Sequence, residues 1–314
     1  MFVVNDKLYR VFSWVAEHIL CGKLFSIWEH LGFHITPNHF YYPIPDTRKL
    51  GKELWLRQSQ LVGVNINEKK QIELIGQLLE FKNEYDTYSS GKTSKPWQYH
   101  YYNPSFGPVD AEVLYCITRY FRPKKVIEIG SGYSTYILAE AILKNAEEYG
   151  YRADLTAIEP YPNKVLKAGF PGLSRLITEK VEEVDLTEFE SLEENDILLI
   201  DSSHVLKIGG DVYYEYTEIL PRLKKGVIVH IHDIFFPSEY PKHWVLNMHR
   251  FWNEQYLIQA FLAFNQAFEI IWCGSYMHLR HPDKLGEAFS SYNRATVWST
   301  KRPGATSLWI RKTA

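Results

Sequence analysis

A glycine-rich stretch near the middle of the chain combines residue types that can bind a nucleotide-like ligand. It runs Val-Ile-Glu-Ile-Gly-Ser-Gly-Tyr-Ser-Thr from Val126 to Thr135. Glycines at 130 and 132 permit a tight turn from a strand into a helix and let the backbone approach a ligand without a Cβ in the way. The free N–H groups at the start of the helix that follows can bind an anion or a carboxylate.

Acidic residues stand at the ends of several expected strands. Glu128 precedes the glycines, Glu159 ends the next apolar run, Asp201 ends the buried run Asp-Ile-Leu-Leu-Ile, and Asp233 ends Gly-Val-Ile-Val-His-Ile-His. In an open parallel sheet, ligands bind at the carboxyl ends of the strands, so these acids predict one site. The two oxygens of Glu159 can accept from both ribose hydroxyls, which favours an adenosine ligand and leaves its identity open.

The stretch around the glycines resembles motif I of the class I S-adenosylmethionine-dependent methyltransferases, and the resemblance extends over residues 100–314. It implies that Glu128, Gly130, Ser131 and Gly132 hold the amino-acid end of the cofactor, with Ser134 beside them. It also implies that Glu159 binds the ribose and that Asp201 borders the cofactor. A nicotinamide enzyme would favour a third glycine at position 135, where this chain has threonine.

The run Asp-Ser-Ser-His, with Asp201 and His204 three residues apart, resembles the DxxH signature of metal-assisted O-methyltransferases that act on sugars and other small hydroxyl compounds. In those enzymes the Asp is a metal ligand and the His serves as general base. Lys207, three residues further on, is a second candidate base if it is buried. The catalytic residues expected here are therefore His204, Asp201 and Lys207.

The family usually has an acidic pair or Asp-Asn after the fifth strand, where this chain has His232 and Asp233. The resemblance thus implies a metal site of Asp201, His232 and Asp233 for Mg²⁺, and the histidine shifts the preference towards a softer divalent cation. Two carboxylates and an imidazole can equally form a metal-free acid–base site. His230, in mid-strand, is expected to be a hydrogen-bonded core histidine.

The resemblance implies methyl transfer from S-adenosylmethionine to a hydroxyl of a small molecule of the sugar or natural-product type. Two alternatives stay open at this point. One is an NAD(P)-dependent oxidoreductase on a similar Rossmann-like fold, and the other is a non-catalytic protein that only binds the cofactor.

The elements that must position these residues alternate between strand and helix. Apolar runs predict strands at 125–129, 153–158, around 176–177, 196–200 and 226–232, and two final β-rich runs at 269–278 and 306–311. Helical periodicity lies between them, notably at 135–148, 210–223 and 244–265. This alternation predicts a doubly wound α/β fold with a mostly parallel, seven-stranded Rossmann-like sheet and an antiparallel C-terminal hairpin.

The first 95 residues have a different pattern. Residues 8–31 and 68–87 are helical in period, and a proline-rich arm at 34–48 lies between them. The run Ser-Ser-Gly-Lys-Thr-Ser-Lys-Pro before residue 97 is the best linker. We therefore expect a helical cap or lid at 1–95 and a Rossmann-like methyltransferase domain at 96–314.

Composition limits the partners. The 314 residues carry a net charge of −2, which disfavours a nucleic-acid partner, and aromatic residues make up 15% of the chain, which suits an apolar pocket. Three scattered cysteines and the absence of a long uncharged apolar run predict a cytoplasmic protein with no membrane partner. The expected partner is a small-molecule acceptor; a homo-oligomer is compatible with the sequence, which does not set the oligomeric state.

Overall fold

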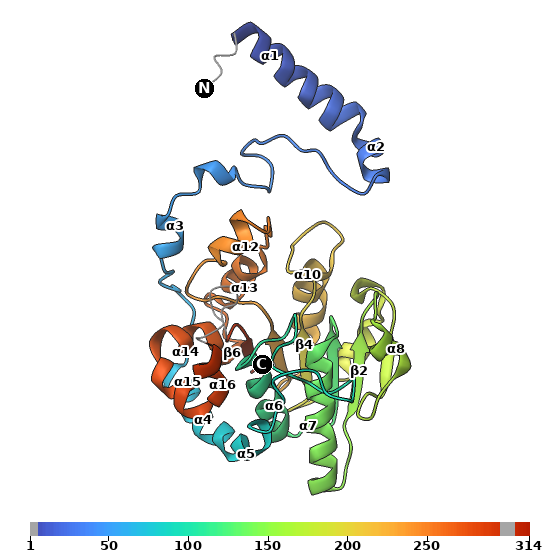
Figure 1. Cartoon of the computed structure of the whole chain (residues 1–314), viewed down its shortest axis with the longest axis vertical. Coiled ribbons are helices and arrows are strands. Elements are labelled where there is room, and N and C mark those ends of the chain that lie inside the picture. The colour runs from blue at the N-terminus through green and yellow to red at the C-terminus, as the bar shows by residue number, and fades with distance from the viewer. Residues whose placement is uncertain (1–5, 296–304) are drawn as a thin grey trace.

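A seven-stranded sheet forms the centre of the computed structural model, which describes residues 6–295 and 305–314 (Figure 1). The strand order is β3-β2-β1-β4-β5-β7-β6. The strands are β1 (Lys125–Ile129), β2 (Asp154–Ile158), β3 (Arg175–Ile177), β4 (Ile197–Ile200), β5 (Ile228–Ile231), β6 (Phe268–Cys273) and β7 (Leu308–Lys312). β1 to β5 pair in parallel, whereas β7 pairs antiparallel with both β5 and β6. The predicted Rossmann-like sheet and its antiparallel C-terminal pair are confirmed.

Helices cover both faces of the sheet, because the side chains of each buried strand alternate between two apolar cores. In β4, for example, Ile197 and Leu199 belong to one core, and Leu198 and Ile200 belong to the other. The first core is completed by α4 (Glu68–Leu78), η3 (Leu79–Phe81), α5 (Lys82–Tyr85), α6 (Asp110–Phe121), α7 (Tyr133–Tyr149), α8 (Lys164–Ala168), α14 (Gly274–Arg280), α15 (Pro282–Ala288) and α16 (Ser290–Ala295). The second is completed by η4 (Val181–Glu183), α9 (Leu186–Glu190), α10 (Asp211–Tyr214), η5 (Glu215–Ile219), α11 (Leu220–Arg222) and α13 (Glu254–Leu262).

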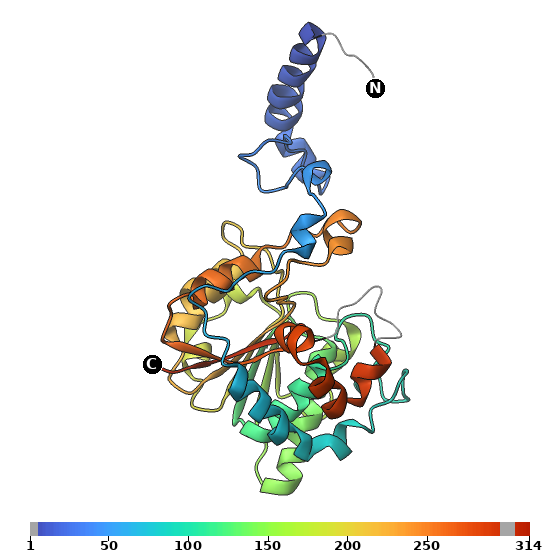
Figure 2. The same ribbon diagram turned by 90° about the vertical axis from the view of Figure 1, so that its left-hand side faces the viewer.

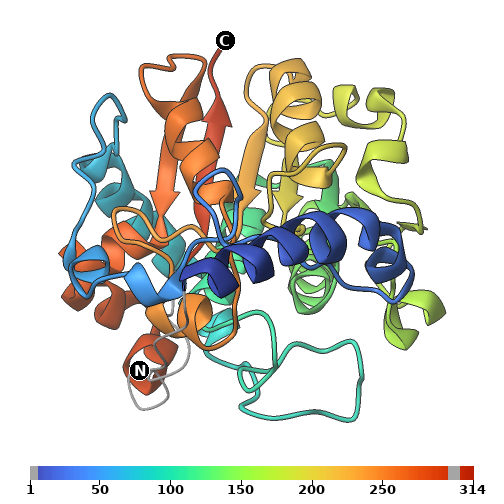
Figure 3. The same ribbon diagram turned by 90° about the horizontal axis from the view of Figure 1, so that it is seen from above.

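The N-terminal segment stands off from this body. It contains α1 (Asp6–Val15), a π-helical stretch η1 (Ala16–Lys23), α2 (Phe25–His30), η2 (Thr47–Lys49) and α3 (Glu53–Leu56). No residue from 11 to 50 is buried, and Figure 2 shows the helices projecting away from the sheet. Figure 3, seen from above, shows them crossing in front of the end at which the parallel strands finish. Within the described part of the chain, no helix combines the length and apolarity needed to cross a membrane.

Helix α4, by contrast, is part of the main body. It packs against β6 and α6, and Leu74, Ile75 and Leu78 are buried in the same core as the sheet. The segment 68–85 therefore shares its core with the residues that follow position 95.

Two expected elements differ from the structure. The helix expected over 244–265 is two helices, α12 (Lys242–Leu246) and α13, separated by an irregular loop at 247–253. The final strand expected over 269–278 ends at Cys273, where α14 begins, and the helices α14 to α16 lie between β6 and β7. The antiparallel pair is thus joined by helices rather than by a hairpin turn.

Candidate functional site

The turn after β1 can be made only by glycine at position 130. Gly130 has a φ of +79°, and a Cβ there would lie 1.9 Å from the carbonyl oxygen of Asp201. The Asp201 N–H donates to the carbonyl of Ile129 at 2.9 Å, so the end of β4 lies directly against the turn. A side chain at 130 would separate the two strand ends.

Thr135 and Glu128 hold the second half of the turn. The Gly132 N–H donates to the Thr135 hydroxyl at 2.9 Å, and this hydroxyl donates to Oε2 of Glu128 at 2.5 Å. Burial raises the pKa of Glu128 to about 7, although the Thr135 hydrogen bond favours the ionised form. Oε1 of Glu128 and Oγ of Ser131 have no hydrogen-bond partner among the described residues, although both atoms are buried. A ligand with polar groups would satisfy them.

A cavity of about 470 Å³ lies beside this turn. Gly130, Glu159 and Asp201 line it, together with the loops after β2 and β4. Glu159 accepts from the Ser131 N–H at 3.2 Å and from the Tyr161 N–H at 2.8 Å, which fixes its carboxylate at the end of β2. A carboxylate has about four acceptor positions, so Glu159 retains capacity for the hydroxyls of a ribose.

A second cavity, of about 590 Å³, meets the first at Asp201, Ser202 and Ser203. His204, His232 and Asp233 line it on the side of the sheet. The remaining described lining consists of Tyr101, Tyr102, Asn103, Pro104, Ser105, Gly107, Pro108, Asp110, Trp244, Met248, Arg250, Trp252 and Thr306. The two cavities share these three lining residues at the end of β4, so ligands bound in them would be neighbours.

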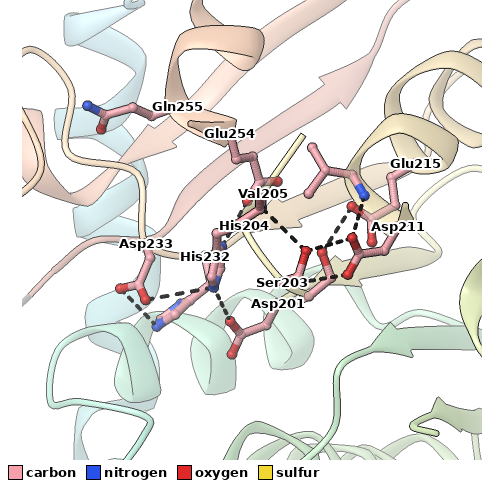
Figure 4. A network of polar contacts seen from close by, with 12 residues as sticks. Asp201, Ser203, His204, Val205, Asp211, Glu215, His232, Asp233, Glu254 and Gln255 are labelled. Carbon is pink, nitrogen blue, oxygen red and sulfur yellow. Dashed lines mark hydrogen bonds and ion pairs between the residues drawn. The ribbon is translucent and has the colours of Figure 1, made fainter. Parts of the chain in front are cut away.

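His204 is held by carboxylates on both of its ring nitrogens (Figure 4). Nδ1 lies 2.8 Å from Oε2 of the fully buried Glu254, the first residue of α13. Nε2 lies 3.3 Å from Oδ1 of Asp201 and 3.9 Å from Oδ2 of Asp233. The Tyr216 hydroxyl donates to the other oxygen of Glu254 at 3.0 Å, so the carboxylate behind His204 is itself fixed.

The charges of this group are set by these contacts. Burial opposes the charged form of His204, but the hydrogen bonds to Asp201 and Glu254 raise its pKa well above the usual value. Burial also opposes the ionised form of Asp201, yet His232 and His204 lower its pKa to about 2. His232 is buried as well, and the neighbouring carboxylates of Asp201 and Asp233 raise its pKa. The contacts therefore favour the imidazolium form of His204 and the carboxylate form of Asp201.

The backbone at this site is in an uncommon conformation. His204 has a φ of +60° and Asp233 a φ of +55°, in the left-handed region that is unfavourable for residues other than glycine. Hydrogen bonds anchor the loop after β4: Ser203 Oγ donates to Asp211 at 2.6 Å, and the Asn253 N–H donates to the carbonyl of His204 at 3.1 Å. Such conformations cluster at functional sites because the surrounding structure enforces them.

The expected metal set is not arranged as a metal site. Among residues 6–295 and 305–314, no group of three or more His, Cys, Asp and Glu side chains could hold a metal ion. The imidazole of His204 lies beside both Asp201 and Asp233, where a shared cation would have to sit. Asp201, His232 and Asp233 thus fit an acid–base group better than a metal site.

The similarity to known proteins agrees with what the glycine-rich motif predicts. Residues 127–234 match a family model described as a methyltransferase domain. These residues therefore resemble a methyltransferase domain, as the sequence motif predicts. The matched segment includes Glu128, Glu159, Asp201, His204 and Asp233. An uncharacterized protein of Archaeoglobus fulgidus is 29% identical over 179 residues, which cover 55% of this chain and 80% of that protein.

Some solved structures of methyltransferases are also similar to this chain, at low sequence identity. An O-methyltransferase from Bacillus cereus in complex with SAH has 11% identity and a TM-score of 0.38, covering 77% of this chain and 91% of that one. CalS11, a TDP-rhamnose 3'-O-methyltransferase of calicheamicin biosynthesis, has 12% identity and a TM-score of 0.41, with coverages of 83% and 99%. MycE of the mycinamycin pathway, in complex with Mg and SAH, has 13% identity and a TM-score of 0.33, with coverages of 76% and 55%.

The structure of the methyltransferase-like domain brings most of the expected residues to one edge of the sheet. Ser134 is buried in the first turn of α7, and the segment 103–107 contributes to the second cavity as well. Lys207 lines the first cavity but is exposed, so the burial on which its role as a base depended is absent. No residue of the arm 34–48 lines either cavity, and Tyr41 is 82% exposed.

The sequence reasoning missed the loop 247–253. It supplies Met248, Arg250 and Trp252 to the second cavity, and its last residue Asn253 and the following Glu254 hold His204. The available signal was the polar pair His249 and Arg250 in His-Arg-Phe-Trp, inside a run that is otherwise apolar enough to read as one helix.

Proposed function

We propose that the protein is an S-adenosylmethionine-dependent methyltransferase that methylates a hydroxyl group of a small molecule. The observation that carries this proposal is the junction at Asp201, where the cavity beside the glycine turn meets a second cavity lined by His204. The family match over residues 127–234 supports methyl transfer, and the presence of a histidine beside the junction supports an oxygen acceptor.

The residues around the first cavity fit this cofactor. Glu159, which lines the cavity, would accept from the ribose hydroxyls. The buried oxygens of Glu128 and Ser131 that lack partners lie in the turn beside Gly130 and would hydrogen-bond to polar groups of the amino-acid end. Gly130 leaves the turn free of a Cβ. When bound, S-adenosylmethionine supplies a methyl group on a positively charged sulfur. An oxygen nucleophile attacks this methyl group in line with the carbon–sulfur bond, and the sulfur leaves. Thr135 stands where a dinucleotide-binding turn would favour glycine, which weighs against the nicotinamide alternative.

His204 would take the proton from the acceptor. An alcohol is a poor nucleophile until its proton leaves, so a base must lie within hydrogen-bond reach of the hydroxyl. Nε2 of His204 lies beside Asp201 and Asp233, which also line the second cavity, while Glu254 holds Nδ1 and stabilises the imidazolium that forms. The carbon–sulfur bond breaks as the carbon–oxygen bond forms, and the acceptor proton ends on Nε2. His204 must be neutral beforehand, so the reaction should accelerate as the pH rises through its raised pKa.

Calorimetric titration tests the cofactor. S-adenosylhomocysteine should bind the protein and NAD should not, and Glu159→Gln should weaken binding about 10- to 100-fold because a charge-assisted hydrogen bond is lost. Glu147→Gln, on the exposed surface of α7, is the matched control and should bind like the unmodified protein. Binding of NAD without S-adenosylhomocysteine would overturn the proposal.

The chemistry is tested by incubation with S-adenosylmethionine and a panel of hydroxyl compounds, with release of S-adenosylhomocysteine as the readout. For any acceptor found, His204→Asn should lower kcat about 100- to 10,000-fold and leave binding of S-adenosylhomocysteine intact. A His204→Asn protein as active as the unmodified one would remove His204 as the base.

A further inference from the structure

Arg250 occupies an unusual place in the second cavity. It lies in the loop between α12 and α13, and it is the one lysine or arginine among the described residues that line this cavity. Its Cζ lies 4.9 Å from the ring centroid of Trp244 and 4.9 Å from that of Trp252. These two rings are nearly perpendicular, with an interplanar angle of 77°, so the guanidinium sits in a corner of two aromatic faces.

The N–H groups of this guanidinium are left for a ligand by the described residues around them. In the described ranges, no side-chain hydrogen bond or ion pair of Arg250 is present, whereas its backbone N–H donates to the carbonyl of Trp244 at 2.9 Å. Because the two rings are nearly perpendicular, at most one of them can stack on a face of the planar guanidinium, and neither accepts a hydrogen as strongly as a carboxylate oxygen does. A planar cation that is held by aromatic contacts, and whose N–H groups have no hydrogen-bond partner among the described residues, is suited to bind a carboxylate or phosphate with two hydrogen bonds.

The indole ring of Trp252 connects this cation to the proposed reaction centre. Its centroid lies 4.3 Å from that of the His204 ring, on which it packs at a tilt of 40°. Arg250 and His204 are therefore separated by a single aromatic ring. Both residues line the same cavity, so one acceptor molecule can contact both.

The charged side chains that line the cavity favour one orientation of an acceptor molecule. On the sheet side of the cavity, His204 and His232 are already paired with Asp201 and Asp233, so no uncompensated positive charge attracts an anion there. Asp110 is occupied by the N–H groups of Thr306 and Ser307. Attraction to Arg250 acts from the opposite side, at the loop. We propose that the acceptor carries an anionic group, a carboxylate or a phosphate, that Arg250 binds while a hydroxyl of the same molecule lies at His204.

This inference rests on the proposed function and is tested separately from it. The protein is first saturated with S-adenosylhomocysteine and then titrated with two matched series. One consists of glucose, glucuronate and glucose phosphate, and the other of hydroxybenzyl alcohol, hydroxybenzoate and hydroxybenzyl phosphate. Charged members should bind at least about 10-fold more tightly than the neutral member of their series, and the tighter of the two anions identifies the group recognised.

Substitutions of Arg250 test whether this residue causes the preference for charged molecules. Arg250→Gln should remove the preference for the charged members, and Arg250→Lys, which keeps the charge but not the planar fork, should retain part of it. Arg222→Gln is the matched control, because Arg222 pairs with Glu218 on the surface of α11 and lines neither cavity. All variants should still bind S-adenosylhomocysteine.

Three results would overturn the inference: no charged member binds, neutral members bind as tightly as charged ones, or Arg250→Gln leaves the affinities for charged members unchanged. Failure of S-adenosylhomocysteine to bind would instead count against the proposed function. The two failures are therefore distinguishable.

Discussion

The charge on His204 decides whether the residue can act as a base. Glu254 and Asp201 face its two ring nitrogens, and these contacts outweigh burial in setting its pKa. Both carboxylates favour the imidazolium, so the neutral ring becomes abundant only above the usual pKa of 6.5. Removing one carboxylate must therefore move the titration to lower pH.

We predict that His204 titrates above 6.5 and that Glu254→Gln lowers the midpoint of its titration. Nuclear magnetic resonance of the histidine ring protons measures both midpoints without an acceptor. His278 is an internal control, because burial lowers its pKa and it should titrate below 6.5 in both proteins. A His204 that titrates at or below its usual value would contradict the network described above.

At the scale of elements, α4 connects the first part of the chain to the sheet. Leu78 is fully buried in the core shared with α6, whereas Leu79, next to it, is 37% exposed. The two leucines have the same chemistry and nearly the same place in the chain. They thus form a pair that isolates the effect of burial.

We predict that Leu78→Ala lowers the free energy of unfolding by about 2–5 kcal/mol, since a buried leucine leaves a cavity. Leu79→Ala should change it by less than about 1 kcal/mol. Urea unfolding followed by fluorescence measures both values. Equal effects of the two substitutions would mean that α4 does not share the core of the sheet.

The hydrophobic pattern of each element decides whether the sequence could predict it. Buried parallel strands are continuous apolar runs, so β4 and β5 were found within two residues of their ends. The loop 247–253 was not found, because Trp252 and Met248 preserve the apolar character of a helix while their packing depends on the cavity they line. The helix α14 was read as strand, because Ser-Tyr-Met-His alternates like a half-buried strand.

The residues of the site differ in the same way in how far the sequence predicts their positions. The sequence predicts Glu128, Glu159, Asp201 and Asp233 at one edge because each lies within two residues of the end of a strand, and parallel strands end together. The contact between His204 and Glu254 joins residues 50 positions apart and depends on how α13 packs, which no local pattern specifies. Arg250 was missed for the same reason.

At the scale of the whole molecule, the N-terminal segment contributes little to the core. Residues 11–50 include no buried side chain, and Phe12, Trp14, Phe40 and Tyr41 are each more than half exposed. Hydrogen bonds to the main body are found further along the described chain. Trp55 Nε1 donates to the carbonyl of Tyr240 at 3.0 Å, and the Ser59 N–H donates to the carbonyl of Pro237 at 2.8 Å.

We predict that deletion of residues 1–50 shifts Tm by less than about 4 °C, which corresponds to roughly 1 kcal/mol or less. Binding of S-adenosylhomocysteine should be unchanged, because none of the described residues of this segment lines either cavity. Differential scanning calorimetry and titration measure the two quantities. A deletion that unfolds the protein or abolishes binding would show that the segment supports the site.

The contact between Gly130 and the carbonyl of Asp201 has a practical consequence for protein engineering. Because Asp201, Ser202 and Ser203 line both the first and the second cavity, substitutions there would alter both cavities at once. Of these two cavities, the loop 247–253 borders only the second. If the proposed function holds, a library that diversifies this loop and keeps the three shared residues would change the choice of acceptor and leave binding of the methyl donor as it is.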